Sequence, residues 1–230
     1  MLELFIIRHG MSVRNHYTDL AFEGDTTLLD LHMEEGKDEA VWPLWKDGEF
    51  QARETGEWLR DHHGHDYVGT YCSPFMRARQ TAELLGIDGA QWQEDERIRE
   101  RFWGDYGPET DPPYTTLEYM GDIHKCGYPT WRTRLPGGEA VVDLYPPADS
   151  FLRDVITTTL AGKVLVVTHG GTMRAIQMVL EGIPLDRAEE CPKIHTENCS
   201  ILHYTLQDFS DDRTTWNASS QLITPWQNAE

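Results

Sequence analysis

Three short apolar runs, each ended by a turn signal, constrain the fold of this chain more than any other feature. The runs are LELFII (residues 2–7), YVGTYCSP (67–74) and KVLVVTHGG (163–171), and the last is the clearest. Apolar runs that stop abruptly at polar residues and glycine are typical of buried parallel strands that lead into loops. We therefore predict three strands of one sheet from these segments.

Helical sequence follows the second and third runs. FMRARQTAELLG (75–86) and TMRAIQMVLEG (172–182) place Ala, Leu and Met at helical spacing, and each ends in a glycine suited to a C-cap. EFQARETGEWLRDHHG (49–64) indicates a further amphipathic helix. Strands that alternate with helices of about ten residues or more predict an α/β fold. We expect a three-layer sandwich with a mostly parallel central sheet and helices on both faces.

The length of 230 residues suits one large domain, and we predict a single domain over residues 1–230. Two segments interrupt the strand and helix pattern and are predicted insertions, an acidic one at about 17–48 and a Pro- and aromatic-rich one at about 105–138. Long insertions of this kind are usually lids or flexible loops. SILHYTL (200–206) and TTWNASSQLIT (214–224) flank a polar stretch and predict a hairpin at the sheet edge.

The composition argues against several kinds of partner. A formal net charge of −19 disfavours nucleic acid and anionic membranes, which the chain would repel at long range. No apolar stretch approaches the roughly 20 residues needed to cross a bilayer, and the start of the chain lacks the features of a secretion signal, so we expect a cytoplasmic protein. The cysteines lack zinc or disulfide-framework spacing and are expected to be free thiols, mostly buried: Cys72, Cys126, Cys191 and Cys199.

Basic and imidazole side chains stand at the carboxyl ends of the predicted strands, where ligands bind in parallel sheets. Arg8 and His9 end the first strand, Arg77 begins the helix after the second, and His169 ends the third. Taken singly, a histidine at a strand end is more often structural than catalytic. Two histidines and two arginines that converge on one crevice, in a chain with only 20 Lys and Arg, indicate instead a site for an anion.

These residue types suit phosphoryl transfer. Arg8 and Arg77 present guanidinium groups that match phosphate oxygens. His9 is the expected nucleophile, because the nearby arginines disfavour its protonation and a backbone carbonyl can fix its tautomer. His169 is expected to stabilise charge on the equatorial oxygens of the transferring group.

Two further groups complete the predicted site. The backbone amides of Gly170 and Gly171 begin a helix, so its dipole favours an anion there, and Gly170 is a predicted contact of the substrate. The leaving oxygen needs a proton, which a carboxylic acid beside the phosphate can supply. Glu100, in the aromatic and arginine-rich stretch RIRERFWGDYG (97–107), is the candidate acid.

Five motifs in a fixed order resemble those of the histidine phosphatase superfamily, which has the phosphoglycerate-mutase-like fold. They are RHG after the first strand, CSPFMRARQTAE, IRERFWGDYG, LPGGEA and VTHGGTMRAI, and the resemblance runs from about residue 2 to residue 206. The resemblance implies that His9 is the phosphorylated nucleophile, His169 its partner and Glu100 the proton donor. The implied reaction passes through phosphohistidine and needs no metal or other cofactor.

The same resemblance extends to the groups that bind phosphate. Arg8 and Arg77 fall on the phosphate-binding arginines, and Asn15 matches a phosphate-contacting asparagine found in many members. NCSI (198–201) resembles a frequent late strand signature that carries no chemical role we can assign. The partner implied is a small phosphorylated substrate, whereas neither its identity nor an oligomeric state follows from the sequence.

Departures from the family pattern favour a phosphatase over a glycolytic mutase. Met11 stands where many members have Glu or Gln, and Glu100 is followed by Arg-Phe-Trp-Gly where mutases typically show Arg-His-Tyr-Gly. Lys125, Arg132 and Arg134 are present downstream, but not in the arrangement with which mutases bind a sugar-acid carboxylate. Three hypotheses therefore stand: a metal-independent phosphomonoesterase, a phosphoglycerate-type mutase, and a catalytically silent module that binds a phosphorylated partner.

Other motifs have simpler interpretations. HHGH (62–65) is expected to be a solvated helix end rather than a metal site, and EEGKDE (34–39) a solvated loop. Glu139 is expected in the first turn of the following helix, which Pro146 and Pro147 kink or restart. One set of aromatics either forms a substrate lid or packs the insertions onto the body, with neither alternative favoured: Trp42, Trp45, Trp103, Tyr106 and Trp131.

Overall fold

A six-stranded sheet forms the centre of the structure, in the order β3-β2-β4-β1-β5-β6. The computed structural model describes the chain except for residues 35–37, 105–130, 160, 193–195, 207–217 and 229–230. The pairs β3–β2, β2–β4 and β4–β1 are parallel, whereas β5 runs antiparallel to both of its neighbours, β1 and β6. The predicted mostly parallel sheet is therefore confirmed. The strands are β1 (Leu2–Arg8), β2 (Gly69–Cys72), β3 (Gln93–Glu94), β4 (Gly162–Thr168), β5 (Ile201–Leu206) and β6 (Ala218–Ile223).

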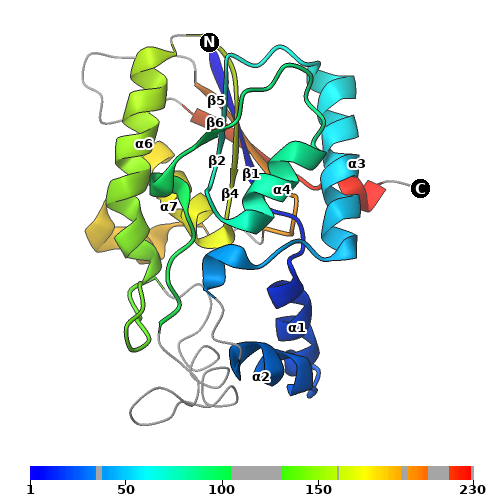
Figure 1. Cartoon of the computed structure of the whole chain (residues 1–230). Coiled ribbons are helices and arrows are strands. Elements are labelled where there is room, and N and C mark those ends of the chain that lie inside the picture. The colour runs from blue at the N-terminus through cyan, green and yellow to red at the C-terminus, as the bar shows by residue number, and fades with distance from the viewer. Residues whose placement is uncertain (35–37, 105–130, 160, 193–195, 207–217, 229–230) are drawn as a thin grey trace.

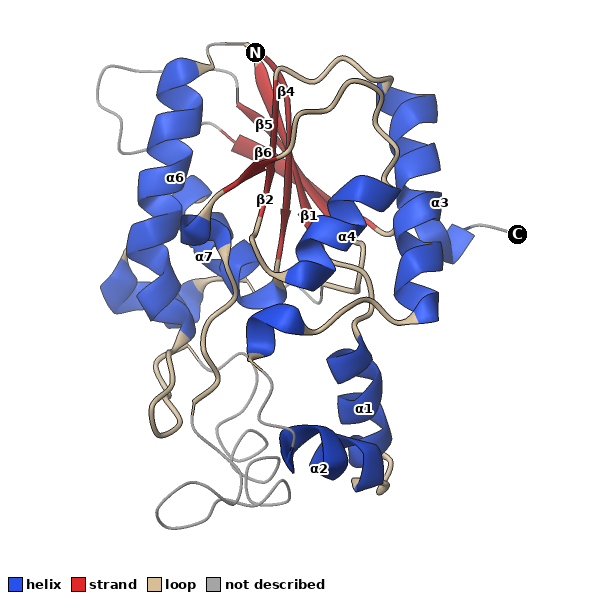
Figure 2. Ribbon diagram, viewed as in Figure 1, coloured by secondary structure: helices blue, strands red, loops and turns tan. Residues whose placement is uncertain are grey.

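Helices cover both faces of this sheet, as Figures 1 and 2 show. Helices α3 (Lys46–His63) and α4 (Met76–Leu84) lie on one face, and α6 (Tyr145–Thr158) and α7 (Gly170–Leu180) on the other. The three-layer sandwich is therefore confirmed. The remaining helices are α1 (Val13–Phe22) and α2 (Thr27–Glu34), with short 3-10 turns η1 (Glu39–Val41), η2 (Glu96–Ile98), η3 (Val141–Leu144), η4 (Leu185–Glu190) and η5 (Pro225–Asn228).

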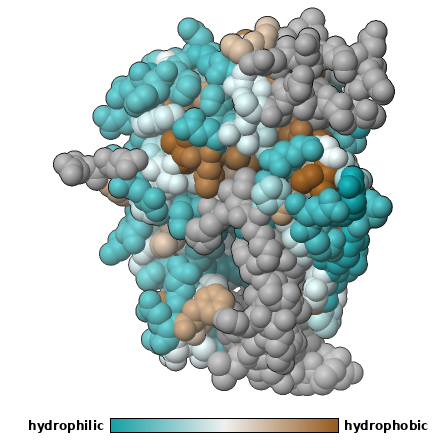
Figure 3. Space-filling model, turned by 180° about the vertical axis from the view of Figure 1, so that it is seen from behind, coloured by the Kyte–Doolittle hydropathy of each residue, from teal (hydrophilic) through white to brown (hydrophobic). Residues whose placement is uncertain are grey.

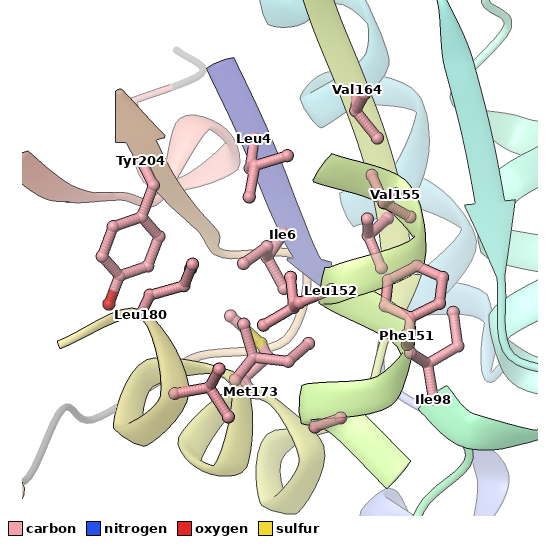
Figure 4. Close-up of a cluster of buried hydrophobic side chains, with 14 of the residues drawn as sticks. Leu4, Ile6, Ile98, Phe151, Leu152, Val155, Val164, Met173, Leu180 and Tyr204 are labelled. Atoms are coloured by element: carbon pink, nitrogen blue, oxygen red, sulfur yellow. The ribbon is translucent and has the colours of Figure 1, made fainter. Parts of the chain in front are cut away.

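The alternation of side chains along β1 divides the core between the two faces. Leu4 and Ile6 pack with residues of α6 and α7, such as Leu152 and Met173, in the cluster drawn in Figure 4. Phe5 and Ile7 point the other way and pack with residues of α3 and α4. Because β1 is apolar on both faces, the sequence LELFII specifies a central strand of a covered sheet.

The predicted hairpin is confirmed, because β5 and β6 pair antiparallel at the edge of the sheet. Pro146 and Pro147 lie in the first turn of α6, directly after η3, so they restart the helix as expected. The predicted insertion at 17–48 is largely helical where it is described, since α1 begins at Val13 and α2 follows it. Figure 1 shows both helices below the carboxyl ends of β1 and β4.

The described surface is mainly hydrophilic on the face drawn in Figure 3, with hydrophobic residues gathered in small patches. Among the described helices, none combines the length and apolar character that a bilayer crossing requires. Cys72, Cys191 and Cys199 are free and buried, as expected. Cys126 lies outside the described residues.

Candidate active site

The register of the two central strands brings the predicted histidines together. Arg8 of β1 pairs with Thr168 of β4, so the next residue of each strand, His9 and His169, leaves the sheet at the same level. The two imidazole centroids lie 5.0 Å apart, and both side chains are buried. Arg77 reaches the pair from the first turn of α4, and its Nε donates to Nε2 of His9 at 3.2 Å. The structure thus assembles these four residues at the carboxyl edge of the sheet.

Hydrogen bonds define the state of His9. Its Nδ1 lies 2.7 Å from the backbone carbonyl of Gly10, as expected, while Nε2 accepts from the Arg77 guanidinium. Since a guanidinium only donates, Nδ1 carries the proton and Nε2 a lone pair. Burial, and then the charges of Arg77 and Arg8, hold the pKa of His9 well below its usual value. His9 is therefore a neutral imidazole at neutral pH, and the lone pair of its Nε2 accepts from Arg77.

His169 is oriented by a residue that sequence reasoning did not single out. Its Nε2 lies 2.7 Å from Oγ of Ser73, which follows β2 in the motif CSP, and its buried Nδ1 has no hydrogen-bond partner among the described residues. Burial, followed by the charge of Arg77, places the pKa of His169 well below its usual value. Ser73 was not identifiable because its contact depends on the pairing of β2 with β4 rather than on a local pattern.

The two arginines differ in how their donors are used. Arg77 donates to the backbone carbonyl of Glu39 at 2.8 Å, and burial lowers its pKa to about 10. Arg8 donates from Nη1 to the carbonyl of Thr196 at 2.6 Å, whereas its buried Nε finds no hydrogen-bond partner in the part of the chain that the structure describes. A Cβ added to Gly170 would lie 3.7 Å from that Nε, so the start of α7 is next to Arg8.

Glu100 belongs to the segment after η2, but its side chain lies next to the first turn of α7, and the residue is 8% exposed. Its Oε1 accepts from the amide of Arg101 at 3.0 Å, and its Oε2 accepts from the amide of Gly171 at 3.3 Å. The expectation that the Gly171 amide is available to phosphate is therefore wrong for this structure, because the carboxylate of Glu100 occupies it. The negative charge of Glu100 also acts on Arg77 of the histidine site.

Asn15 and Asn198 hold the backbone at and just after His9. Oδ1 of Asn15 accepts from the backbone and hydroxyl of Ser12, which caps α1, so the described role of Asn15 is structural and its contact with phosphate stays a prediction. Asn198 Nδ2 donates to the carbonyl of His9 at 2.9 Å and lies 3.4 Å from Oδ1 of Asn15. The motif NCSI thereby gains a role that its sequence did not reveal.

The expectation for Glu139 is wrong. Glu139 precedes η3, and its carboxylate binds Arg99 and the amide of Phe102 instead of a helix N-terminus. Glu39, expected in a solvated loop, pairs with Arg14 at 2.6 Å, and both side chains are only 14% exposed. Local sequence suggested solvated carboxylates, but the fold brings arginines to both.

The two described arginines of the stretch compared with the mutase motif, Arg132 and Arg134, both form ion pairs with carboxylates. Arg132 pairs with Glu189, and Arg134 pairs with Asp143, while Lys125 lies outside the described residues. Within the described part of the chain, no group of three or more His, Cys, Asp or Glu is arranged to hold a metal ion.

The described members of the predicted aromatic set each have a packing partner. Trp42 and Trp131 are buried. Trp45 stacks on His16 with ring centroids 4.4 Å apart, and the Arg101 guanidinium lies 3.8 Å from the ring centroid of Trp103. Trp131 packs with Met178 and Ala188 of the body, whereas the choice between lid and packing stays open for the other members of the set. Tyr106 lies outside the described residues.

HHGH ends α3, and Gly64 caps it with a positive φ of 68°. His62 Nδ1 lies 2.8 Å from the carbonyl of Trp58, one turn earlier, and the side chain is exposed. The interpretation as a solvated helix end is thus confirmed for His62.

The fold and the paired-histidine site together define an α/β protein with its ligand site at the carboxyl edge of a parallel sheet. The family model described as histidine phosphatase superfamily (branch 1) matches residues 4–219. The chain belongs to this superfamily, which confirms the resemblance seen in its motifs.

Relatives within the superfamily include both phosphatases and mutases. A protein of Hydrogenobacter thermophilus, provisionally named phosphoserine phosphatase 2, is 34% identical over 143 residues, 60% of this chain and 66% of that one. The aligned part thus spans just under two thirds of that relative. A 2,3-bisphosphoglycerate-dependent phosphoglycerate mutase of Gloeobacter violaceus is 28% identical over 214 residues, 86% of this chain and 83% of that one.

Solved structures support the fold. The mycobacterial glucosyl-3-phosphoglycerate phosphatase in complex with inorganic phosphate matches with a TM-score of 0.69 and 18% identity, covering 99% of both chains. Phosphatase or mutase activity is therefore the general expectation for a member of this superfamily, and the choice between them depends on the site.

Proposed function

We propose that the protein is a metal-independent phosphatase that hydrolyses a phosphomonoester of a small metabolite through a phosphohistidine intermediate on His9. One observation carries the proposal: two buried nitrogen atoms near His9 have no hydrogen-bond partner among the described residues, namely Nε of Arg8 and Nδ1 of His169, which is a donor when Nε2 accepts from Ser73. Buried polar atoms are normally satisfied, and a phosphoryl group offers the acceptor oxygens that these atoms lack.

The chemistry has two steps. Nε2 of His9 attacks phosphorus, a P–N bond forms, and the bond from phosphorus to the ester oxygen breaks while Glu100 donates a proton to that oxygen. Water then attacks the phosphohistidine, Glu100 accepts a proton from it, and the P–N bond breaks to release inorganic phosphate. Arg8, Arg77 and His169 stabilise the charge on the equatorial oxygens in both steps.

Two observations favour hydrolysis over mutase chemistry. Arg132 and Arg134, the described cations closest in sequence to a mutase motif, are each held in an ion pair with a carboxylate. The relative from Hydrogenobacter thermophilus is, moreover, provisionally named as a phosphatase. Phosphoglycerate mutase chemistry is the second candidate. The Gloeobacter violaceus relative has that name, and its similarity to this chain extends over most of both proteins.

The test is release of inorganic phosphate in excess EDTA from sugar phosphates, phosphoglycerates, nucleotides, phosphoserine and phosphopeptides. We expect turnover of at least one phosphomonoester, no turnover by His9→Ala, and a fall of at least about 10²-fold for Glu100→Gln on an alkyl ester. His62→Ala, which removes an exposed histidine from the end of α3, is the matched control and should keep full activity.

A parallel assay separates the alternatives. Isomerisation of 3-phosphoglycerate primed by the bisphosphate, with little release of phosphate, would replace hydrolysis by mutase chemistry. Binding of phosphate without turnover of any substrate would indicate the silent binding module. Complete dependence on an added divalent metal would contradict the mechanism.

A further inference from the structure

The segment that carries Glu100 has no regular secondary structure between η2 and η3 in its described part, residues 99–104. A loop with no ladder of its own must find other partners for its carbonyl groups, and those partners decide how firmly its side chains are held. In the Glu100 loop, which we define as residues 98–102, four carbonyls have a partner. Their donors are Thr168 Oγ1 to Ile98 at 2.7 Å, Thr172 Oγ1 to Arg99 at 2.5 Å, Arg99 Nη1 to Glu100 at 2.7 Å and the Glu139 amide to Phe102 at 2.7 Å.

Glu139 and Arg99 form the centre of this network. The guanidinium of Arg99 binds both carboxylate oxygens of Glu139, at 2.7 and 2.8 Å, in a bidentate fork. The same carboxylate accepts from the amide of Phe102 at 2.8 Å, and Arg99 lies 4.3 Å from the centroid of the Phe102 ring. The Glu139 backbone and side chain therefore hold the loop on both sides of Glu100.

Arg99 and Glu139 form an ion pair in which both side chains are partly buried. Burial acts to raise the pKa of Glu139, but hydrogen bonds from Arg99 and from the Phe102 amide outweigh it and hold the pKa below its usual value. The hydrogen bonds that Arg99 donates to Glu139 raise the pKa of Arg99. Both partners are therefore charged at neutral pH, and a fork between two charged groups is a stronger restraint than a neutral hydrogen bond.

We propose that Glu139 is a positioning residue for the acid: through Arg99 and the Phe102 amide it fixes the Glu100 loop, so that the Glu100 carboxyl reaches the leaving oxygen. The inference rests on the proposed function, in which Glu100 is the proton donor. Glu139 itself contacts no reacting atom in this account. A displacement of about 1 Å at a catalytic group can reduce the rate about 10²-fold, so the fork is strong enough to matter.

The test uses two esters that differ in how much they need a proton. Phenyl phosphate has a basic leaving oxygen and depends on the acid, whereas the leaving group of p-nitrophenyl phosphate departs readily without protonation. For Glu139→Gln we expect kcat/KM for phenyl phosphate to fall about tenfold or more, and that for p-nitrophenyl phosphate to change less than about threefold. The comparison uses kcat/KM because this parameter reports the first step alone, whereas kcat also includes hydrolysis of the phosphohistidine, in which Glu100 acts for both esters. Arg99→Lys, which keeps the charge but loses the fork, should show the same pattern. A purely structural role would lower both rates by the same factor.

A matched control lies in the same segment. Asp143 accepts from the guanidinium of Arg134 and from the backbone amide of Ala140, the same kinds of contact that Glu139 makes, but with partners outside the Glu100 loop. Asp143→Asn should leave the ratio of the two rates unchanged. Thermal unfolding of each variant shows whether it is folded. If Glu139→Gln does not fold, Arg99→Lys is used as the test variant in its place.

Glu100→Gln separates failure of this inference from failure of the proposed function. If Glu100→Gln lowers the phenyl phosphate rate selectively while Glu139→Gln and Arg99→Lys lower both rates equally or neither, Glu139 does not position the acid. If Glu100→Gln itself shows no selectivity, the role of Glu100 as proton donor is wrong, and the inference about Glu139 fails with it.

Discussion

Gly171 is the residue at which the proposed acid and the start of α7 meet. A Cβ added there would overlap Oε1 of Glu100, and the Gly171 amide donates to the other carboxylate oxygen. The absence of a side chain at this position therefore determines where the carboxyl group of Glu100 lies. The THGG motif thus contributes a close approach to the acid as well as a helix N-terminus.

Gly171→Ala is expected to displace the Glu100 carboxyl and to lower kcat/KM for phenyl phosphate by about 10²-fold, while kcat/KM for p-nitrophenyl phosphate is affected much less. Stability should change little, because alanine is favourable within a helix and the flexible Glu100 side chain can move aside. Steady-state kinetics with both esters and a urea titration measure the two effects. Equal losses on both esters would mean that the added methyl group disturbs more than the acid.

At the scale of elements, the strands and the sheet were predictable because their signals are local. Of the four parallel strands, β1, β2 and β4 are short, mostly apolar runs, whereas β3 is an exposed Gln-Glu pair that carries no such signal. Because the carboxyl ends of parallel strands meet, the convergence of His9, His169 and Arg77 follows from sequence. The helix α1 was not predicted, because none of its residues is buried and it lacks the apolar stripe that identifies a surface helix. Its start is instead defined by a capping box between Ser12 and Asn15.

The supporting residues of the site were not predictable for a related reason. Asn198 contacts the carbonyl of His9 across 189 positions of sequence, Ser73 contacts His169 across 96, and Glu139 contacts Arg99 across 40. Such contacts arise only when the tertiary structure has formed. No spacing rule for a single helix or strand contains them.

The capping box at the start of α1 gives a prediction for the insertion. Ser12→Ala removes the side-chain acceptor for the Asn15 amide, and it should lower the free energy of unfolding by about 0.5–2 kcal/mol. Because α1 begins four residues after His9, we also expect a higher KM for the phosphate ester. Urea unfolding and steady-state kinetics provide the two measurements. Ser12→Asp, which retains a capping acceptor, should recover most of the stability, and failure to do so would argue against the cap.

At the scale of the whole molecule, the buried histidines link stability to pH. The pKa of His9 and that of His169 lie well below the usual value of 6.5 in the folded state, mainly through burial. As the pH falls below about 6.5, the unfolded chain binds protons at these positions and the folded chain does not. The stability contributed by the neutral imidazoles is thus complete above that pH and is lost as the pH decreases, by up to about 1.4 kcal/mol per pH unit for each histidine.

His9→Gln should therefore reduce the loss of stability between pH 7 and pH 5.5, because it removes one of the two groups. Urea unfolding at several pH values measures the slope for the wild-type protein and for the variant. His62→Gln, at the exposed end of α3, should keep the wild-type slope. Identical slopes for all three proteins would show that the buried imidazoles are protonated in the folded state or are not buried.

The central strand β1 has a consequence for how the chain is made. Its neighbours in the sheet are β4 and β5, which begin at Gly162 and Ile201, about 160 and 200 positions further along the chain. Both edges of this apolar strand therefore stay unpaired in a nascent chain until those segments have been synthesised, and unpaired apolar strands associate readily with other chains. His9, the proposed phosphoryl carrier, follows β1 directly, so its surroundings form only after β4 and β5 have paired with this strand.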